Sequence, residues 1–240
     1  MNKIRLGVNI DHVATVRNAR GELYPSPLRA ALMSQKFGAD SVTIHLREDR
    51  RHINDLDLKK IRFKLTIPLN LEIAATKEML AIAIKQKPPF ICIVPEKRKE
   101  VTTEGGLNLK YKKNFLQLVI KKLKKNGSRV SLFVNPNITD VIRAKKLDCD
   151  CIEIHTGKIC NLINKNQPYQ LELDKIKKAV KKGHEIGMEV HAGHGLTFRS
   201  AKILTKVKNI SEFNIGHFLI GESIFEGLAK TIKKFKRIIK

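Results

Sequence analysis

The pattern of hydrophobic and polar positions divides the chain into short apolar runs separated by longer amphipathic segments. The short runs predict β-strands at 4–10, 41–46, 68–73, 90–94, 129–134, 151–155, 188–192 and 213–220. The longer segments, in which apolar residues recur every three or four positions, predict helices near 27–37, 54–65, 76–86, 112–126, 138–147, 171–186, 198–206 and 222–239. Strands therefore alternate with helices along the whole chain.

This alternation predicts an α/β fold, and more narrowly a (β/α)8 TIM barrel. Such barrels run to about 250 residues as one unit, and no linker rich in Gly, Ser or Pro divides this chain, so we expect a single domain over 1–240. Gly38, Gly127 and Gly187 directly follow predicted helices, where a left-handed residue commonly ends a helix. An open, doubly wound parallel sheet is the alternative that the same alternation allows.

The chain is strongly basic, with 47 Lys and Arg residues against 23 Asp and Glu residues and a formal net charge of +24. Lysines occur in pairs, such as Lys121 with Lys122 and Lys233 with Lys234, on the polar faces of predicted helices. Trp is absent, and the few aromatic residues do not alternate with basic ones as a base-stacking surface requires. We interpret the charge as solvated helix faces without specific nucleic-acid binding, although non-specific binding of polyanions stays open.

Several features indicate the compartment. Asp11 and His12 interrupt the N-terminal segment before the apolar core of a signal peptide forms, and no stretch reaches the roughly 20 apolar residues of a membrane span. The four cysteines are too sparse for a disulfide framework, and Cys149 and Cys151 lack the further ligands of a zinc site. We therefore expect a cytoplasmic protein that contacts no membrane, keeps its cysteines as buried thiols and binds no metal.

Polar side chains gather where the predicted strands end. In a (β/α)8 barrel the active site lies at the carboxyl ends of the strands and in the loops that follow them. A single histidine or carboxylate in a strand is more often structural, but here such residues end or follow six of the predicted strands. They are Asn9, Asp11, His12, His45, Arg47, Glu72, Glu153, His155, His191, His194 and His217. We therefore predict an active site at this face of the barrel.

Three loops carry residues that suit phosphate binding or a mobile cover. HLREDRRH at 45–52 contains arginines, which bind phosphate through two parallel hydrogen bonds, although a solvated charged loop is the alternative. GHG at 193–195 and Gly216 lie where many barrels hold phosphate, and a helix beginning after Gly221 would add its dipole. Gly105 and Gly106 indicate either a mobile lid or a simple turn.

Eight short motifs follow one another along the chain. They are GVNIDHVAT at 7–15, HLREDRRH at 45–52, NLE at 70–72, VPEKR at 94–98, TTEGG at 102–106, EIHTG at 153–157, AGHGL at 192–196 and NIGH at 214–217. In sequence and order they closely resemble the pyridoxine 5′-phosphate synthase family, the ring-closing enzymes of vitamin B6 biosynthesis. The resemblance covers nearly the whole chain, and the HLREDRRH and PEKR…TTEGG strings are long enough to be specific.

The resemblance implies a (β/α)8 barrel that condenses 1-deoxy-D-xylulose 5-phosphate with 3-amino-2-oxopropyl phosphate to pyridoxine 5′-phosphate. Phosphate and water are released, and neither a metal nor an organic cofactor takes part. By the same resemblance, His45 and Glu72 accept protons, His194 donates one and Glu153 stabilises a transition state. The family assembles as a homo-octamer built from dimers.

The resemblance also assigns residues to the two phosphorylated substrates. The aminoketone phosphate would be held by Asn9, Arg20, Gly195, Gly216 and His217. The deoxyxylulose phosphate would be held by Asp11, His12, Arg47, His52 and Thr102. These types suit the task, because phosphate needs Arg and backbone donors, while ring closure needs several acid–base groups.

One position departs from the family pattern, and one rival enzyme class stays open. His191 stands where we expect Asn, before Ala192, Gly193 and His194, and we expect it to fill the structural role of that Asn near the site. The rival is a phosphate-binding barrel isomerase or aldolase. A Schiff-base aldolase would need a lysine at a strand end, whereas the lysines here lie on predicted helices.

Overall fold

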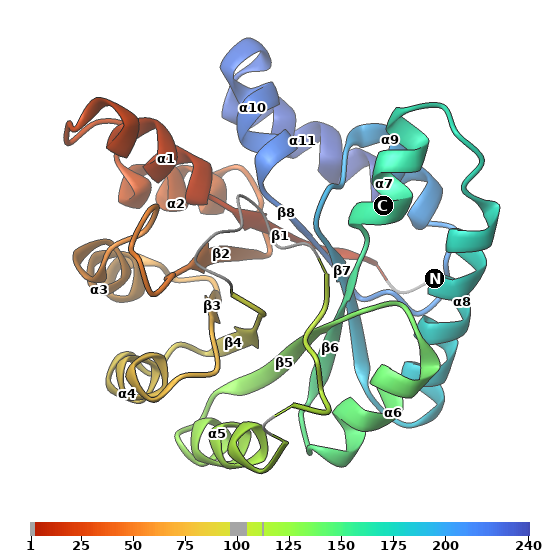
Figure 1. The fold of residues 1–240 in the computed structure, drawn as a ribbon. Helices are drawn as coiled ribbons and strands as arrows, with labels where there is room; N and C mark the ends of the chain where they lie inside the picture. Colours follow the sequence, from red (N-terminus) through yellow and green to blue (C-terminus); the bar gives the residue numbers. More distant parts are fainter. Residues whose placement is uncertain (1–2, 97–104, 112) are drawn as a thin grey trace.

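The computed structural model describes residues 3–96, 105–111 and 113–240. In this part of the chain, eight parallel strands form a closed barrel in sequential order, with β8 paired to β1 (Figure 1). The strands are β1 Arg5–Asn9, β2 Ser41–His45, β3 Leu69–Ile73, β4 Phe90–Ile93, β5 Arg129–Val134, β6 Cys151–His155, β7 Glu189–Gly193 and β8 Glu212–Ile215. The predicted (β/α)8 barrel is confirmed, and the pairing of β1 with β8 excludes an open sheet.

Helices surround the barrel and cover its outer face (Figure 1). They are α1 Asp11–Arg20, α2 Pro27–Lys36, α3 Asp55–Lys64, α4 Lys77–Gln86, α5 Lys113–Lys125, α6 Ile138–Lys146, α7 Gly157–Asn164, α8 Gln170–Glu185, α9 Phe198–Leu204, α10 His217–Glu226 and α11 Leu228–Ile238. Outward-facing strand residues such as Leu6, Val8, Val42 and Ile44 are fully buried against these helices. Within the described residues, no helix is both long enough and apolar enough to span a membrane.

The prediction of a strand over 213–220 was wrong in its second half. Strand β8 ends at Ile215, Gly216 precedes the first turn of α10, and His217 begins that helix. The expected helix over 222–239 is also divided, because Gly227 has a φ of +79° between α10 and α11. The helix N-terminus that we placed after Gly221 therefore lies at Gly216, directly at the end of the strand.

Helices end as the glycine pattern predicted. Gly38, Gly127 and Gly187 have φ values of +98°, +93° and +71°. A residue with a Cβ atom costs energy in this left-handed region, whereas glycine, which has none, adopts it freely. At the opposite end of a helix, Asn54 accepts a hydrogen bond from the backbone N–H of Asp57, whose carboxylate accepts the N–H of Asn54 in return.

The amino-terminal end of the barrel interior is closed by a network of charges. Arg5 pairs with Glu189 from β7 and, at 2.8 Å through Nε, with Glu212 from β8. Arg129 from β5 reaches Glu189 at 3.1 Å, and its guanidinium lies 3.7 Å from the ring centre of Phe90. Because these pairs join strands across the barrel, this end of the interior is filled by side chains that serve stability.

Further up the interior, a glycine makes room for a polar side chain. A Cβ atom added to Gly7 on β1 would lie 2.0 Å from Oδ1 of Asn214 and 2.9 Å from Oγ of Ser41. Both neighbours belong to strands and are buried, so they have little freedom to move away. Glycine is therefore needed at this position for its lack of a side chain rather than for its backbone freedom.

We predict that Gly7→Ala lowers the free energy of unfolding by about 1–3 kcal/mol, the usual cost of overpacking a core. Urea unfolding followed by circular dichroism measures the change. Gly221→Ala is the matched control, since an added Cβ there meets nothing within 4 Å and lies in a helix. Equal stability of both variants would contradict the prediction.

Candidate active site

The carboxyl ends of the strands bring most of the predicted site residues to one mouth of the barrel. Asn9 ends β1, His45 ends β2 and Glu72 lies near the end of β3. Glu153 and His155 come from β6, and His194 follows β7 directly. Since all eight strands are parallel, these ends meet on one face even though the residues are far apart in the sequence.

Asp11 joins the ends of β1 and β2. Its carboxylate accepts the backbone N–H of His45 at 2.8 Å through Oδ1 and the side-chain amide of Asn9 at 3.0 Å through Oδ2. The backbone N–H of Asp11 donates in return to Oδ1 of Asn9 at 2.9 Å. Burial raises the pKa of Asp11, and this effect outweighs the opposing influence of His45 and the hydrogen bonds. The arrangement fixes the backbone that carries His45.

His45 lies between two carboxylates. Its Nδ1 is 3.9 Å from Oε2 of Glu72, and its Nε2 is 3.5 Å from Oε2 of Glu96. The Glu96 side chain is fully buried, and Oε1 accepts the backbone N–H of Glu48 at 3.0 Å. Burial alone would raise the pKa of Glu96, but His45 and Arg47 together hold it below its ordinary value. Glu96 was noted in the sequence only as part of a motif, so its place beside His45 was missed.

Glu72 and Glu153 are two carboxyl groups at the strand ends, of which Glu153 is buried and Glu72 is partly buried. Burial is the largest cause of the raised pKa of Glu72, and the charges of Glu153 and Asp11 raise it further. Burial also raises the pKa of Glu153 to about 8, against a hydrogen bond from Asn214 that lowers it. Two like charges in one site oppose each other, so simultaneous ionisation of both groups is disfavoured.

Three histidines form a cluster at the β1, β2 and β8 side of the mouth. The ring of His12 lies 4.8 Å from that of His217 and 5.9 Å from that of His52. The hydroxyl of Thr15 is 2.8 Å from Nδ1 of His52. Burial lowers the pKa of His52 to about 4, with further lowering by His12, Arg47, His45 and Arg51. Burial and His217 also lower the pKa of His12. Several imidazoles that can donate hydrogen bonds therefore lie together near Arg47, an arrangement that suits an anion.

A second histidine pair lies across the mouth. The rings of His155 and His194 have centroids 5.0 Å apart, and both lie against Gly157, where an added Cβ would be 2.8 Å from each. Burial followed by the neighbouring His194 lowers the pKa of His155 to about 4. Burial likewise lowers the pKa of His194. His194 itself has a φ of +77°, an unusual conformation for a residue with a side chain. His155 was noted at a strand end but was not assigned to the site.

The position of Arg20 differs from that of the residues at the strand ends. Arg20 ends α1 on the exposed surface, about 14 Å along the helix axis from Asp11 by the rise of 1.5 Å per residue. Thr102 lies outside the described residues, as does most of the predicted lid. Gly106 packs against the end of β5, where its backbone N–H donates to Oδ1 of Asn135 at 2.9 Å.

The structure places His191 below the mouth. Its Nε2 lies 2.8 Å from Oε1 of Glu189, within the charge network that closes the amino-terminal end of the barrel, and 3.5 Å from the guanidinium of Arg5. Hydrogen bonding by His191 is the largest cause of the lowered pKa of Glu189. The backbone of His191 nevertheless pairs in register with Glu153 of β6, so the position adjoins the site while its side chain contacts the charge network below.

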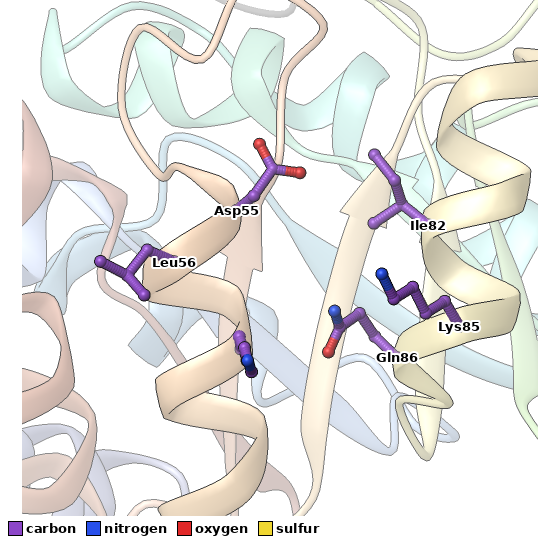
Figure 2. Close-up of a pocket in the computed structure, with 6 residues that line it drawn as sticks. Asp55, Leu56, Ile82, Lys85 and Gln86 are labelled. Atoms are coloured by element: carbon purple, nitrogen blue, oxygen red, sulfur yellow. The ribbon is translucent and has the colours of Figure 1, made fainter.

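A separate surface pocket lies between α3 and α4 (Figure 2). It is lined by Asp55, Leu56, Lys59, Ile82, Lys85 and Gln86. Among the described residues, no group of three or more His, Cys, Asp and Glu side chains is arranged to hold a metal ion, and all four cysteines are buried free thiols.

Solved structures with the same architecture support the fold alone. The chain superposes on N-(5′-phosphoribosyl)anthranilate isomerase from Pyrococcus furiosus with a TM-score of 0.63 and 14% identity, over 98% of each chain. It superposes on a tryptophan synthase chain from M. tuberculosis with a TM-score of 0.66 and 7% identity, over 100% of this chain and 94% of the other.

Sequence relatives are much closer. The chain is 58% identical to the pyridoxine 5′-phosphate synthase of Pelagibacter ubique over 98% of both proteins. It is 50% identical to the enzyme of the same name from Zymomonas mobilis, over 99% of this chain and 92% of that protein. The family model for the pyridoxal phosphate biosynthesis protein PdxJ matches residues 6–240. With the barrel and its polar mouth, this match over nearly the whole length places the chain in the PdxJ family of pyridoxal phosphate biosynthesis proteins.

Proposed function

We propose that the chain is a pyridoxine 5′-phosphate synthase. It condenses 1-deoxy-D-xylulose 5-phosphate with 3-amino-2-oxopropyl phosphate, closes the pyridine ring and releases phosphate and water by acid–base catalysis. The observation that carries the proposal is the buried pair Glu72 and Glu153 beside His45, in a chain 58% identical to a relative of that name. Ring closure requires repeated proton transfers, and such a set of groups suits them.

Glu72 and His45 act as proton acceptors in this proposal, and Glu153 stabilises a cationic transition state. The amine of one substrate and the ketone of the other form an iminium, whose positive charge favours ionised carboxylates nearby. In its ionised form, Glu72 accepts a proton from the substrate. Because burial raises the pKa of Glu72, its ionised form is a stronger base than an exposed glutamate.

His194 is the proposed proton donor. Its lowered pKa makes the protonated imidazole a stronger acid than free histidine, and a bound phosphate dianion favours that protonated form. The left-handed backbone at His194 and Gly195, with φ of +77° at both, directs the loop after β7 around the mouth. Backbone strain of this kind is common at functional sites.

The two phosphate groups have separate proposed sites. Asp11, His12, Arg47, His52 and Thr102 hold the deoxyxylulose phosphate. Asn9, Arg20, Gly195, Gly216 and His217 hold the aminoketone phosphate. The second site is supported by the N-terminus of α10 at Gly216, where unpaired backbone N–H groups favour an anion. The first is supported by the histidine cluster beside Arg47, whose imidazole and guanidinium groups offer hydrogen-bond donors to an anion.

We predict that Arg47→Lys weakens binding of deoxyxylulose phosphate about tenfold, because a single ammonium replaces a planar guanidinium with two donors in parallel. The Arg47 side chain is buried, and its Nε lies 3.6 Å from Asp49 and 3.7 Å from Glu96. Calorimetric titration measures the dissociation constant. Arg143→Lys on α6, away from the mouth, is the control, and an unchanged constant in Arg47→Lys counts against the role.

The proposal extends to assembly and location. We propose one domain over 1–240, a homo-octamer, and a cytoplasmic enzyme that binds neither membranes nor specific nucleic acids. Assembly is supported by large apolar side chains exposed near the neighbouring helices α1 and α10 (Figure 1). These side chains are Leu23, Tyr24, Ile224 and Phe225, which are 91%, 70%, 73% and 86% exposed. Light scattering of the purified chain tests the assembly, and a monomer at micromolar concentration would contradict it.

The test of the proposed activity uses both phosphorylated substrates with the purified chain. Mass spectrometry should detect pyridoxine 5′-phosphate, and inorganic phosphate should appear in step with it. Each substrate alone serves as a control. Turnover of one substrate by itself, with no pyridine product from the mixture, would favour an isomerase or aldolase instead.

A further inference from the structure

We infer that Asn214 on β8 is a positioning residue, which orients the carboxyl group of Glu153 and makes it the first of the Glu72–Glu153 pair to ionise. The inference rests on the proposed function, in which Glu153 stabilises a cationic transition state. Asn214 itself acts through Glu153. Asn214 belongs to the sequence motif NIGH, but the sequence assigns it no role in catalysis or substrate binding.

The geometry begins with a short hydrogen bond. The side-chain amide of Asn214 donates to Oε2 of Glu153 at 2.7 Å. Both side chains are buried, with residue exposures of 5% and 3%, so water competes little for this contact. A hydrogen bond to a charged carboxylate is among the stronger hydrogen bonds in proteins, and burial strengthens it further.

Two more residues fix the direction of the Asn214 amide. Asn70 on β3 donates through its side-chain nitrogen to the hydroxyl of Thr43 on β2 at 3.3 Å. The hydroxyl of Thr43 donates in turn to Oδ1 of Asn214 at 3.4 Å. With its oxygen facing Thr43, the amide of Asn214 presents its nitrogen to Glu153. These hydrogen bonds therefore form a chain across the barrel from β3 to β6. In each of them the donated hydrogen is directed to the next residue toward the carboxylate of Glu153.

The barrel backbone leaves space for this pair at two glycines. An added Cβ at Gly193 on β7 would lie 1.9 Å from Oε1 of Glu153. An added Cβ at Gly7 on β1 would lie 2.0 Å from Oδ1 of Asn214. The two side chains thus occupy the volume that residues on neighbouring strands would otherwise fill, and their positions are sharply defined.

The hydrogen bond also makes Glu153 easier to ionise than Glu72. Burial raises the pKa of Glu153, the Asn214 hydrogen bond opposes this effect, and the charge of Glu212 on β8 raises the pKa further. The pKa of Glu72 is raised by burial and by two carboxylates, while its neighbour His45 lies at 3.9 Å, beyond hydrogen-bond distance. The Asn214 hydrogen bond therefore favours the charge on Glu153, and repulsion between the two groups disfavours a second charge on Glu72.

The test compares two shape-conserving variants with a control. Asn214→Leu removes the donor to Glu153, and Thr43→Val removes only the hydroxyl that orients Asn214. Thr231→Val is the matched control, because Thr231 is equally buried but lies on α11 and donates to the backbone of Gly227. Thr43→Val keeps the test decisive if Asn214→Leu does not fold.

Two measurements are made on each folded variant. The first is the pH dependence of kcat/KM for formation of pyridoxine 5′-phosphate. The second is an infrared titration of the Glu153 carboxyl group, identified by its absence in Glu153→Gln. Removing a hydrogen bond from the ionised form raises the pKa, so the rise of activity with pH should move to higher pH. We expect about one to two pH units in Asn214→Leu and a smaller shift of the same sign in Thr43→Val.

The outcomes separate the inference from the proposed function. If the variants lose thermal stability while both pH profiles match wild type, Asn214 is only structural and the inference fails. If the wild type makes no pyridoxine 5′-phosphate, the proposed function fails. The infrared titration still decides whether Asn214 governs ionisation of Glu153. A shift in Thr231→Val as large as that in Thr43→Val would also overturn the inference.

Discussion

Glu72→Gln should leave the barrel folded and reduce kcat by about 10²- to 10⁴-fold, the usual contribution of an acid–base group. The amide keeps the size of the side chain but removes the proposed proton acceptor beside His45. It also removes one member of a buried, mutually repelling pair, so the fold should not suffer. Steady-state kinetics with both substrates, together with thermal unfolding, measures the two effects.

Glu185→Gln is the control for this substitution, since Glu185 lies on the exposed surface of α8 and pairs with Lys181 and Lys182 of its own helix. The pH profile adds a second comparison. Because Glu72→Gln removes an ionisable carboxyl group from the site, the pH profile of the variant should lack the ionisation of Glu72. Near wild-type turnover in a folded Glu72→Gln enzyme would show that Glu72 does not carry the proton transfer.

His194→Asn should lose about 10²- to 10⁴-fold in kcat, while His191→Asn should stay within several-fold of wild type. His194 faces the mouth beside His155, whereas His191 contacts Glu189 in the network at the other end of the barrel. Asn is the right replacement at position 194, because it tolerates the left-handed backbone better than most residues and cannot donate a proton as an acid.

The two histidine variants serve as controls for each other, since both are partly or fully buried and both come from the β7 segment. In His191→Asn, Glu189 keeps its contacts with Arg5 and Arg129, so the lower network should survive. Kinetics and thermal unfolding of both proteins provide the measurement. If His191→Asn abolished turnover and His194→Asn did not, the assignment of roles would be reversed.

The interior of this barrel is polar along most of its length, which is costly for stability. Buried carboxyl groups and imidazoles lose hydration, and each needs a partner. At the amino-terminal end, ion pairs such as Arg5 with Glu212 provide those partners. At the mouth, Glu72 and Glu153 are left with raised pKa values instead. This contrast matches the division of such barrels into a stabilising end and a reactive end.

Local periodicity in the sequence determined the barrel and most of its elements. Apolar strand residues and helix faces must be buried in any such fold, so their spacing is visible within each segment. Where the segment carried few apolar residues, as in α1 Asp11–Arg20, the helix was missed. The apolar residues after Ile215 favoured a longer strand, although β8 ends at Ile215 and a helix begins at His217.

Only the tertiary structure decided which polar groups meet. The sequence, with the family resemblance, named Glu72, Glu153, His45 and His194, and parallel strands placed them at one mouth. It gave no sign that Asn214 would meet Glu153, which lies 61 positions away. Strand register and the direction of each side chain set such contacts, and so do the charges and burial that shift a pKa. These depend on the closed barrel as a whole, because no local pattern records which strands face one another across its interior.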